Sequence, residues 1–206
     1  MEYNSKNIKK KYQNRDFPSR HNFNARWTLI ESFLPKEPCW FLDIGANNGD
    51  TQIRLSQAGH YSVGIEVDPD AAKRNLPNRA TMMISEVNPD MISVMPKFAG
   101  IFFMSVFHRM WDLNGSLFAK EVLKNLGQRC HFMIFEGSSR HARYITQKKS
   151  EIPPFANLNE EDSIKWHYEL LHEAIPTGQI KLIGTTKTIK TSDPRPLFYI
   201  RNIKNG

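Results

Sequence analysis

The sequence predicts an α/β fold with a seven-stranded, mostly parallel sheet, helices on both faces and an antiparallel last strand. Two observations predict this fold class. From residue 24 onward, short apolar runs alternate with segments of helical periodicity, which is typical of consecutive βαβ units and a parallel sheet. The last two apolar runs, 180–189 and 196–201, are joined by a short loop, so they must pair antiparallel.

The elements follow one another from a first helix over 24–33, which Pro35 ends. The pattern then predicts strands at 40–44, 62–66, 80–84, 100–105 and 131–136, with helices at 50–58, 69–75, 90–95 and 115–126. A longer helix is expected over 160–175, because one of its faces would carry Ile164, Tyr168, Leu171 and Ile175.

The chain divides into a basic arm, expected over 1–24, and one domain over 25–206. A length of 206 residues with 40 % apolar residues is enough to build one such core. The first 30 residues hold seven basic and two acidic side chains, so they contribute most of the net charge of +7. Such an arm can bind a polyanion (nucleic acid, phosphorylated glycan or an anionic membrane surface) or remain a solvated tail.

Composition disfavours a membrane-spanning or metal-binding protein. The longest apolar stretch, 99–107, is far shorter than the roughly 20 residues that a membrane-spanning helix needs. The amino terminus carries no secretory apolar region. Cys39 and Cys130 are not spaced like a metal site or a disulfide framework, so we expect no metal. A cytoplasmic location is the expectation that follows.

The stretch from Asp43 to Gly49, Asp-Ile-Gly-Ala-Asn-Asn-Gly, is the most specific motif. Gly45 and Gly49 allow a tight turn and the close approach of a ligand to the main chain. A dinucleotide fingerprint would have a glycine where Asn47 stands, which disfavours nicotinamide and flavin cofactors. Asp43 suits an ammonium group, and Glu66, at the end of the next apolar run, is placed to accept hydrogen bonds from a ribose diol. The alternative is a core turn with no ligand.

Polar side chains follow the other expected strands too, at the edge where open α/β sheets bind ligands. They include Asp68, Ser85, Glu86, Ser105 and Glu136. After the fourth strand, His108 is the best candidate for acceptor chemistry, because a neutral imidazole can take a hydroxyl proton and a protonated one can bind an anion. Cations after the fourth and fifth strands can meet an anionic acceptor at the same rim, and they are Arg109, Arg140, His141 and Arg143.

Together these motifs resemble a known family. The 43–49 motif with Glu66 is similar to motifs I and II of the class I (Rossmann-like) S-adenosylmethionine-dependent methyltransferases. Ser105-Val-Phe-His108, Gly115, Phe135-Glu136 and the last-strand run 195–199 resemble the domains that methylate a terminal phosphate on bacterial O-antigen polysaccharides. Those domains carry two histidines where this chain has His108 and Arg109. A similar Ser-Val motif occurs in RNA methyltransferases that modify a 5′ γ-phosphate.

The resemblance implies S-adenosylmethionine as cofactor, S-adenosylhomocysteine as product, and an oxygen acceptor, either hydroxyl or phosphate. The cofactor-binding residues it implies are Arg26 (or Arg20), Asp43, Gly45, Asn47, Gly49, Glu66, Asp68, Ser85, Glu86 and Ser105. We take His108 and Glu136 as candidate catalytic residues. The expected partners are an anionic small molecule or glycan and, through the arm, RNA. Methylation of RNA or tRNA, and a catalytically silent donor-binding partner protein, remain the alternatives.

Overall fold

The computed structural model describes residues 23–73, 75–138, 153–188 and 191–202. Most of the expected basic arm lies outside these ranges, as do Arg20 and three of the acceptor-binding candidates, Arg140, His141 and Arg143.

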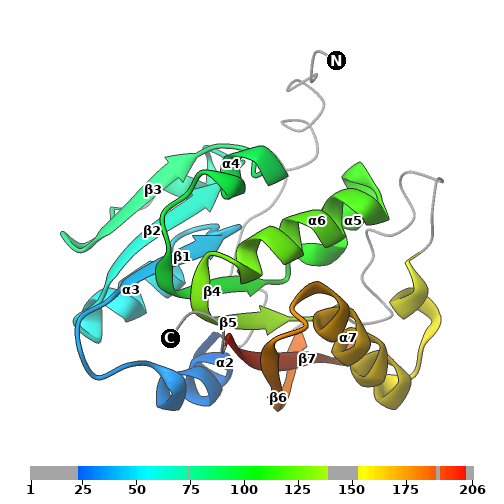
Figure 1. The fold of residues 1–206 in the computed structure, drawn as a ribbon. Helices are drawn as coiled ribbons and strands as arrows, with labels where there is room; N and C mark the ends of the chain where they lie inside the picture. The colour runs from blue at the N-terminus through cyan, green and yellow to red at the C-terminus, as the bar shows by residue number, and fades with distance from the viewer. Residues whose placement is uncertain (1–22, 74, 139–152, 189–190, 203–206) are drawn as a thin grey trace.

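A seven-stranded sheet with the order β3-β2-β1-β4-β5-β7-β6 forms the centre of the molecule (Figure 1). Its strands are β1 (Trp40–Ile44), β2 (Tyr61–Glu66), β3 (Ala80–Ile84), β4 (Phe98–Met104), β5 (Cys130–Glu136), β6 (Gly178–Thr188) and β7 (Thr191–Asn202). Strands β1 to β5 pair parallel, whereas β7 runs antiparallel to both β5 and β6. The predicted fold class is confirmed.

Helices cover both faces of the sheet. The α-helices are α2 (Phe23–Ile30), α3 (Asp50–Gln57), α4 (Pro89–Ser93), α5 (Phe107–Asn114), α6 (Ser116–Gly127) and α7 (Glu160–Ala174). Short 3-10 turns are η1 (Glu31–Phe33), η2 (Ala71–Lys73) and η3 (Pro154–Asn157). In Figure 1, α5, α6 and α7 lie in front of the sheet, and their apolar residues share one core with the strands. Residues of α2 and α3 belong to a second core on the other face.

Neighbouring residues of the central strands point into opposite cores. Phe41 and Phe102 belong to the core with α2 and α3, while Leu42 and Phe103 belong to the core with α5 to α7. All four are at most 1 % exposed. A parallel strand buried on both faces reads as a continuous apolar run, which is why these strands were recognisable without any alternation of polar residues.

Three local predictions were wrong. Of the helix expected over 69–75, the described residues form only the turn η2, and Pro77 lies close behind that segment. The segment after β4, for which no helix was predicted, forms helix α5, which buries Phe107, Met110 and Trp111 and ends at Gly115, where φ is +91°. On α7, Tyr168 is 40 % exposed, and the buried face includes His167 instead.

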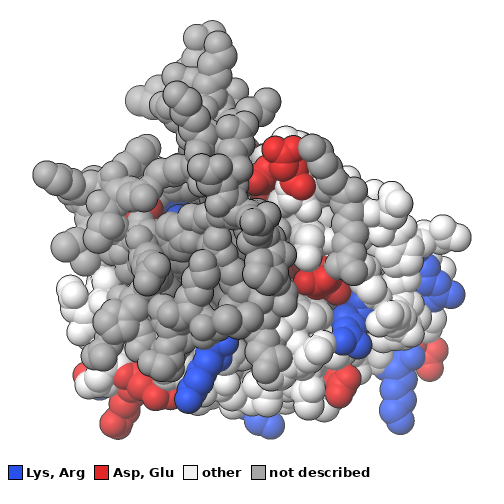
Figure 2. Space-filling model, turned by 180° about the vertical axis from the view of Figure 1, so that it is seen from behind, with Lys and Arg blue, Asp and Glu red and all other residues white. Residues whose placement is uncertain are grey.

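Charges of both signs are interspersed over the described residues visible in Figure 2, which views the molecule from behind. Within the described ranges, no helix is both long and apolar enough to cross a bilayer.

Candidate active site at the carboxyl edge of the sheet

A cavity of about 330 Å³ opens at the carboxyl ends of β1, β2 and β4, roofed by residues of α2 and α5. Its volume lies at the lower end of the range for small-molecule sites, roughly 300 to 1,000 Å³. Most of the predicted site residues line it, namely Arg26, Asp43, Gly45, Asn47, Glu66, Asp68, Ser85, Glu86, Ser105 and Arg109. Gly49, His108 and Glu136 do not belong to the lining. The polar strand ends therefore converge as expected, except at β5.

The turn after β1 depends on three residues with positive φ. Gly45, Asn47 and Gly49 have φ values of +73°, +50° and +80°. A Cβ on Gly45 would overlap a methyl group of Val106, and one on Gly49 would lie 2.5 Å from Leu76 Cδ2. The space at both glycines is thus filled by protein side chains. The glycines serve the turn and its packing, while Gly45 offers the cavity its main chain.

Asp43 is a buried acid that faces the cavity. It is 3 % exposed and accepts a hydrogen bond of 3.2 Å from Gln52 Nε2. Gln52 in turn lies against the main chain of Gly64 in β2, because any Cβ at that position would overlap Gln52 Nε2. Burial raises the pKa of Asp43 to about 7. A cation placed beside Asp43 would stabilise its charged form, so this end of the cavity suits an ammonium group.

Glu66 joins the loops that follow β1 and β2. Its Oε2 accepts from the main-chain N–H of Asn47 at 2.8 Å, and its Oε1 accepts from the N–H groups of Val67 and Asp68 at 2.8 and 2.9 Å. Burial raises the pKa of Glu66, while these three hydrogen bonds oppose the shift. A carboxylate has about four lone-pair sites, so Glu66 retains capacity on Oε2 for a ligand hydroxyl.

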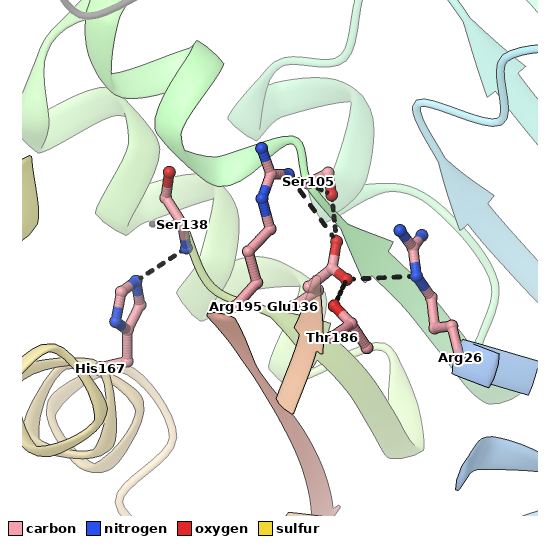
Figure 3. Close-up of polar contacts among 7 residues, drawn as sticks. All are labelled: Arg26, Ser105, Glu136, Ser138, His167, Thr186 and Arg195. Atoms are coloured by element: carbon pink, nitrogen blue, oxygen red, sulfur yellow. Dashed lines mark hydrogen bonds and ion pairs between the residues drawn. The ribbon is translucent and has the colours of Figure 1, made fainter. Parts of the chain in front are cut away.

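Glu136, at the end of β5, is the centre of a buried polar cluster formed with Arg26, Ser105, Thr186 and Arg195 (Figure 3). Its Oε1 lies 3.1 Å from Arg26 Nε and accepts a hydrogen bond of 2.6 Å from Thr186 Oγ1, and Oε2 accepts from Ser105 Oγ. Arg195 Nη1 is 4.0 Å from Oε2 and donates to Ser105 Oγ at 2.8 Å. The carboxylate is fully buried, so these partners compensate its charge.

This cluster holds two cavity-lining residues in place. Ser105 has a φ of +60°, a conformation that costs a residue with a side chain about 1 kcal/mol, and its bonds to Glu136 and Arg195 oppose that cost. Arg26, on α2, keeps its Nη2 buried without a hydrogen-bond partner among the described residues while it lines the cavity. A buried guanidinium N–H of this kind suits an anionic ligand group such as a carboxylate.

His108 and His167 are both buried histidines, but only the second had no predicted role. His108, in α5, is 4 % exposed. His167, in α7, lies 2.7 Å through Nδ1 from the carbonyl oxygen of Ser163 and accepts at Nε2 from the N–H of Ser138 at 3.2 Å (Figure 3). Burial lowers its pKa to about 4, so it stays neutral and fixes the main chain just after β5.

Sequence reasoning missed the contribution of α5 to the lining. Arg109 was expected there, but Met110, Leu113 and Asn114 line the cavity as well. Their positions at helical spacing were visible in the sequence, yet no helix was predicted there. The described residues contain no group of His, Cys, Asp and Glu suited to a metal ion.

Comparisons with known proteins bear on the fold. The sequence matches no protein-family model, and no curated protein sequence matches it. The bifunctional kinase-methyltransferase WbdD superposes with a TM-score of 0.65 at 21 % identity, over 89 % of this chain and 40 % of that one. The chain has the class I methyltransferase fold. It spans about two fifths of the WbdD structures that it matches.

Two further solved structures with this class I fold are matched over nearly their whole length. Magnesium protoporphyrin IX methyltransferase (ChlM) from Synechocystis PCC 6803, solved with bound SAM, has a TM-score of 0.58 at 15 % identity, covering 97 % of this chain and 98 % of that one. Precorrin-6y C5,15-methyltransferase from Geobacter metallireducens GS-15 has a TM-score of 0.57 at 12 % identity, covering 90 % and 92 %. The acceptors that these names indicate differ widely, so the shared fold specifies none.

Proposed function

We propose that this chain is an S-adenosylmethionine-dependent methyltransferase that acts on an anionic oxygen acceptor. The observation that carries the proposal is the arrangement of charges in the cavity. Asp43 suits the ammonium of the donor's methionine end and Arg26 suits its carboxylate, while Glu66 has an acceptor site for the ribose. Asp68, Ser85 and Glu86 extend the lining beyond Glu66, where the adenine would lie. The donor carries its methyl group on a sulfonium, which makes that group reactive toward a nucleophilic oxygen.

Residues near Ser105 favour an acceptor that is already ionised. Methyl transfer is an in-line displacement, so alignment of the acceptor oxygen supplies much of the catalysis. Arg109 lines the cavity from the first turn of α5 and can orient a phosphate or carboxylate oxygen. Glu136 is fully buried and engaged with its cluster, which favours a supporting role over that of a general base. An ionised oxygen needs no base to remove a proton.

A phosphorylated glycan is the finer proposal for the acceptor, and it rests on the resemblance of the 105–108 motif to polysaccharide phosphate methyltransferases. The fold similarity to WbdD is compatible with it. RNA or tRNA methylation and a catalytically silent partner protein are the competing functions. We propose a cytoplasmic location, which is compatible with all of these functions.

Donor binding tests the first part of the proposal. Calorimetric titration with S-adenosylhomocysteine should give a saturable isotherm for the wild-type chain and none for Glu66→Ala. Glu66→Gln, which keeps one carbonyl acceptor for the loop N–H groups, separates lost ligand contacts from lost loop structure. Glu169→Ala, an exposed acid on α7, is the matched control and should bind like wild type. Unchanged affinity in both Glu66 variants would contradict the ribose assignment.

A labelled-methyl transfer assay tests the acceptor. Purified protein is incubated with methyl-labelled S-adenosylmethionine and, in turn, phosphorylated oligosaccharides, RNA and small hydroxylated compounds. Label is expected on the phosphorylated oligosaccharides, as a methyl phosphodiester. Label on RNA alone would favour the RNA alternative, and donor binding without transfer to any acceptor would favour the silent partner.

A further inference from the structure

A row of aromatic and cationic side chains lies along the edge of the sheet opposite the cavity. The arrows of β1 to β5 in Figure 1 point the same way, so the residues that begin these strands share one edge. Following the strand order β3-β2-β1-β4, this edge presents Arg79, Tyr61, Trp40 and Lys97. We call these four residues the amino-edge row.

Three members of the amino-edge row are stacked on one another. The rings of Trp40 and Tyr61 are 5.0 Å apart between centroids and inclined by 22°. Arg79 Cζ lies 5.0 Å from the centroid of Tyr61, and its guanidinium donates to the carbonyl oxygen of Gly59, which holds it there. The strand register explains the stack, because Trp40 pairs with Tyr61 and Arg79 precedes Ala80, the partner of Ser62.

Trp40 at the centre of the row is unusually accessible. It is 53 % exposed, whereas Trp27 and Trp111 are 7 % and 4 % exposed and Trp166 is partly buried. Arg79, which stacks on Tyr61, and Lys97, which lies two residues before the position opposite Trp40 in β4, are exposed as well. The row therefore presents a pre-ordered aromatic surface with a cation at the start of each of the two strands that border β2 and β1.

We propose that the amino-edge row binds single-stranded nucleic acid. A base can stack on Trp40, since base–aromatic stacking requires only a π-face, and phosphates can then approach Arg79 and Lys97. Neighbouring strands are about 4.8 Å apart, so four strands give the row a length of about 15 Å, enough for a short single-stranded segment. The exposed cations favour a ligand that carries phosphates, such as a nucleic acid, over a neutral sugar that could stack on the same ring. This site is distinct from the cavity and does not depend on the proposed methyl transfer.

Tryptophan fluorescence tests the proposal on the full chain. Titration with a twelve-nucleotide oligouridylate at low salt should quench the emission, because the accessible tryptophan is the one that stacks. Trp40→Leu should abolish the quenching and weaken the affinity about tenfold. RNA that binds elsewhere on this variant, including on the amino-terminal arm, is not expected to cause the same quenching, because the accessible tryptophan has been removed.

Charge and control variants complete the test. Lys97→Gln should reduce the slope of the logarithm of the binding constant against the logarithm of salt concentration by about 0.7. Leu117→Ala, at a side chain that is 84 % exposed on α6, should change neither affinity nor quenching. Quenching that persists in Trp40→Leu, or unchanged affinity and salt slope in both row variants, would overturn the proposal. Equal quenching by neutral maltohexaose would also overturn it, in favour of a sugar-binding platform.

Discussion

The buried carboxyl group of Asp43 should make donor binding depend on pH. With a pKa of about 7 in the ligand-free protein, roughly half of the Asp43 side chains are ionised at pH 7 and about 1 % at pH 5. The donor's ammonium binds the ionised form. Affinity for S-adenosylhomocysteine should therefore fall about 50-fold from pH 7 to pH 5, equivalent to about 2 kcal/mol. The ligand's amine, with a pKa near 8, stays largely protonated over this range.

Calorimetry at both pH values measures this change, and a second ligand isolates its source. Glu66 also has a raised pKa, so part of any loss can come from the ribose end. 5′-Methylthioadenosine lacks the amino acid end and reports that part alone. The reasoning is refuted if the two ligands lose affinity equally, or if Asp43→Asn keeps the full 50-fold dependence.

The same ionisation should destabilise the ligand-free fold. Because the pKa of Asp43 in the folded protein lies above its ordinary value of 3.8, its favourable contribution is complete below pH 3.8 and is lost as the pH rises through about 7. Asp43→Asn should then raise the free energy of unfolding at pH 8, with an upper bound of about 4 kcal/mol. Urea denaturation measures this difference. If Asp43→Asn is no more stable than the wild type at pH 8, the ionised carboxylate of Asp43 does not destabilise the fold.

Three further substitutions probe the buried cluster and the acceptor end. Glu136→Ala should cost about 3 to 5 kcal/mol in urea denaturation, because it leaves Arg26 and Arg195 buried without their carboxylate; a cost under about 1 kcal/mol would show that the cluster is not held by charge. Ser105→Gly should be about 1 kcal/mol more stable than Ser105→Ala, since glycine adopts a φ of +60° without strain, and equal stability would argue against that strain. His108→Ala should keep S-adenosylhomocysteine binding, because His108 does not line the cavity, and should lower turnover in the labelled-methyl assay by disturbing the packing of α5, which carries Arg109; full activity would show that the acceptor end does not depend on His108.

The turn after β1 and the acid after β2 were predictable because their signals are local. Positive φ at Gly45 and Gly49 and a carboxylate at the end of an apolar run are each visible within a few residues. The parallel sheet then brings Asp43 and Glu66 to one edge, since both lie at the carboxyl ends of the paired strands β1 and β2. Ten predicted residues consequently line one cavity.

The cluster around Glu136 could not be predicted from the sequence, because its members are distant along the chain. Thr186 and Arg195 come from the antiparallel pair β6 and β7, whose register carries irregularities that no local pattern reveals. Only the fold shows that both side chains meet Glu136. The misplaced face of α7 has a similar cause, since His167 is buried through hydrogen bonds to Ser163 and Ser138 that satisfy both ring nitrogens.

Gly64, in β2, affects the cavity indirectly through Gln52. Its own atoms do not line the cavity, yet its missing Cβ makes room for Gln52, whose amide donates to Asp43. An alanine at position 64 would displace that amide in a close-packed interior and leave Asp43 with one fewer partner. Positions 43, 52 and 64 should therefore vary together in homologous chains, with a shorter side chain at 52 wherever 64 carries a Cβ.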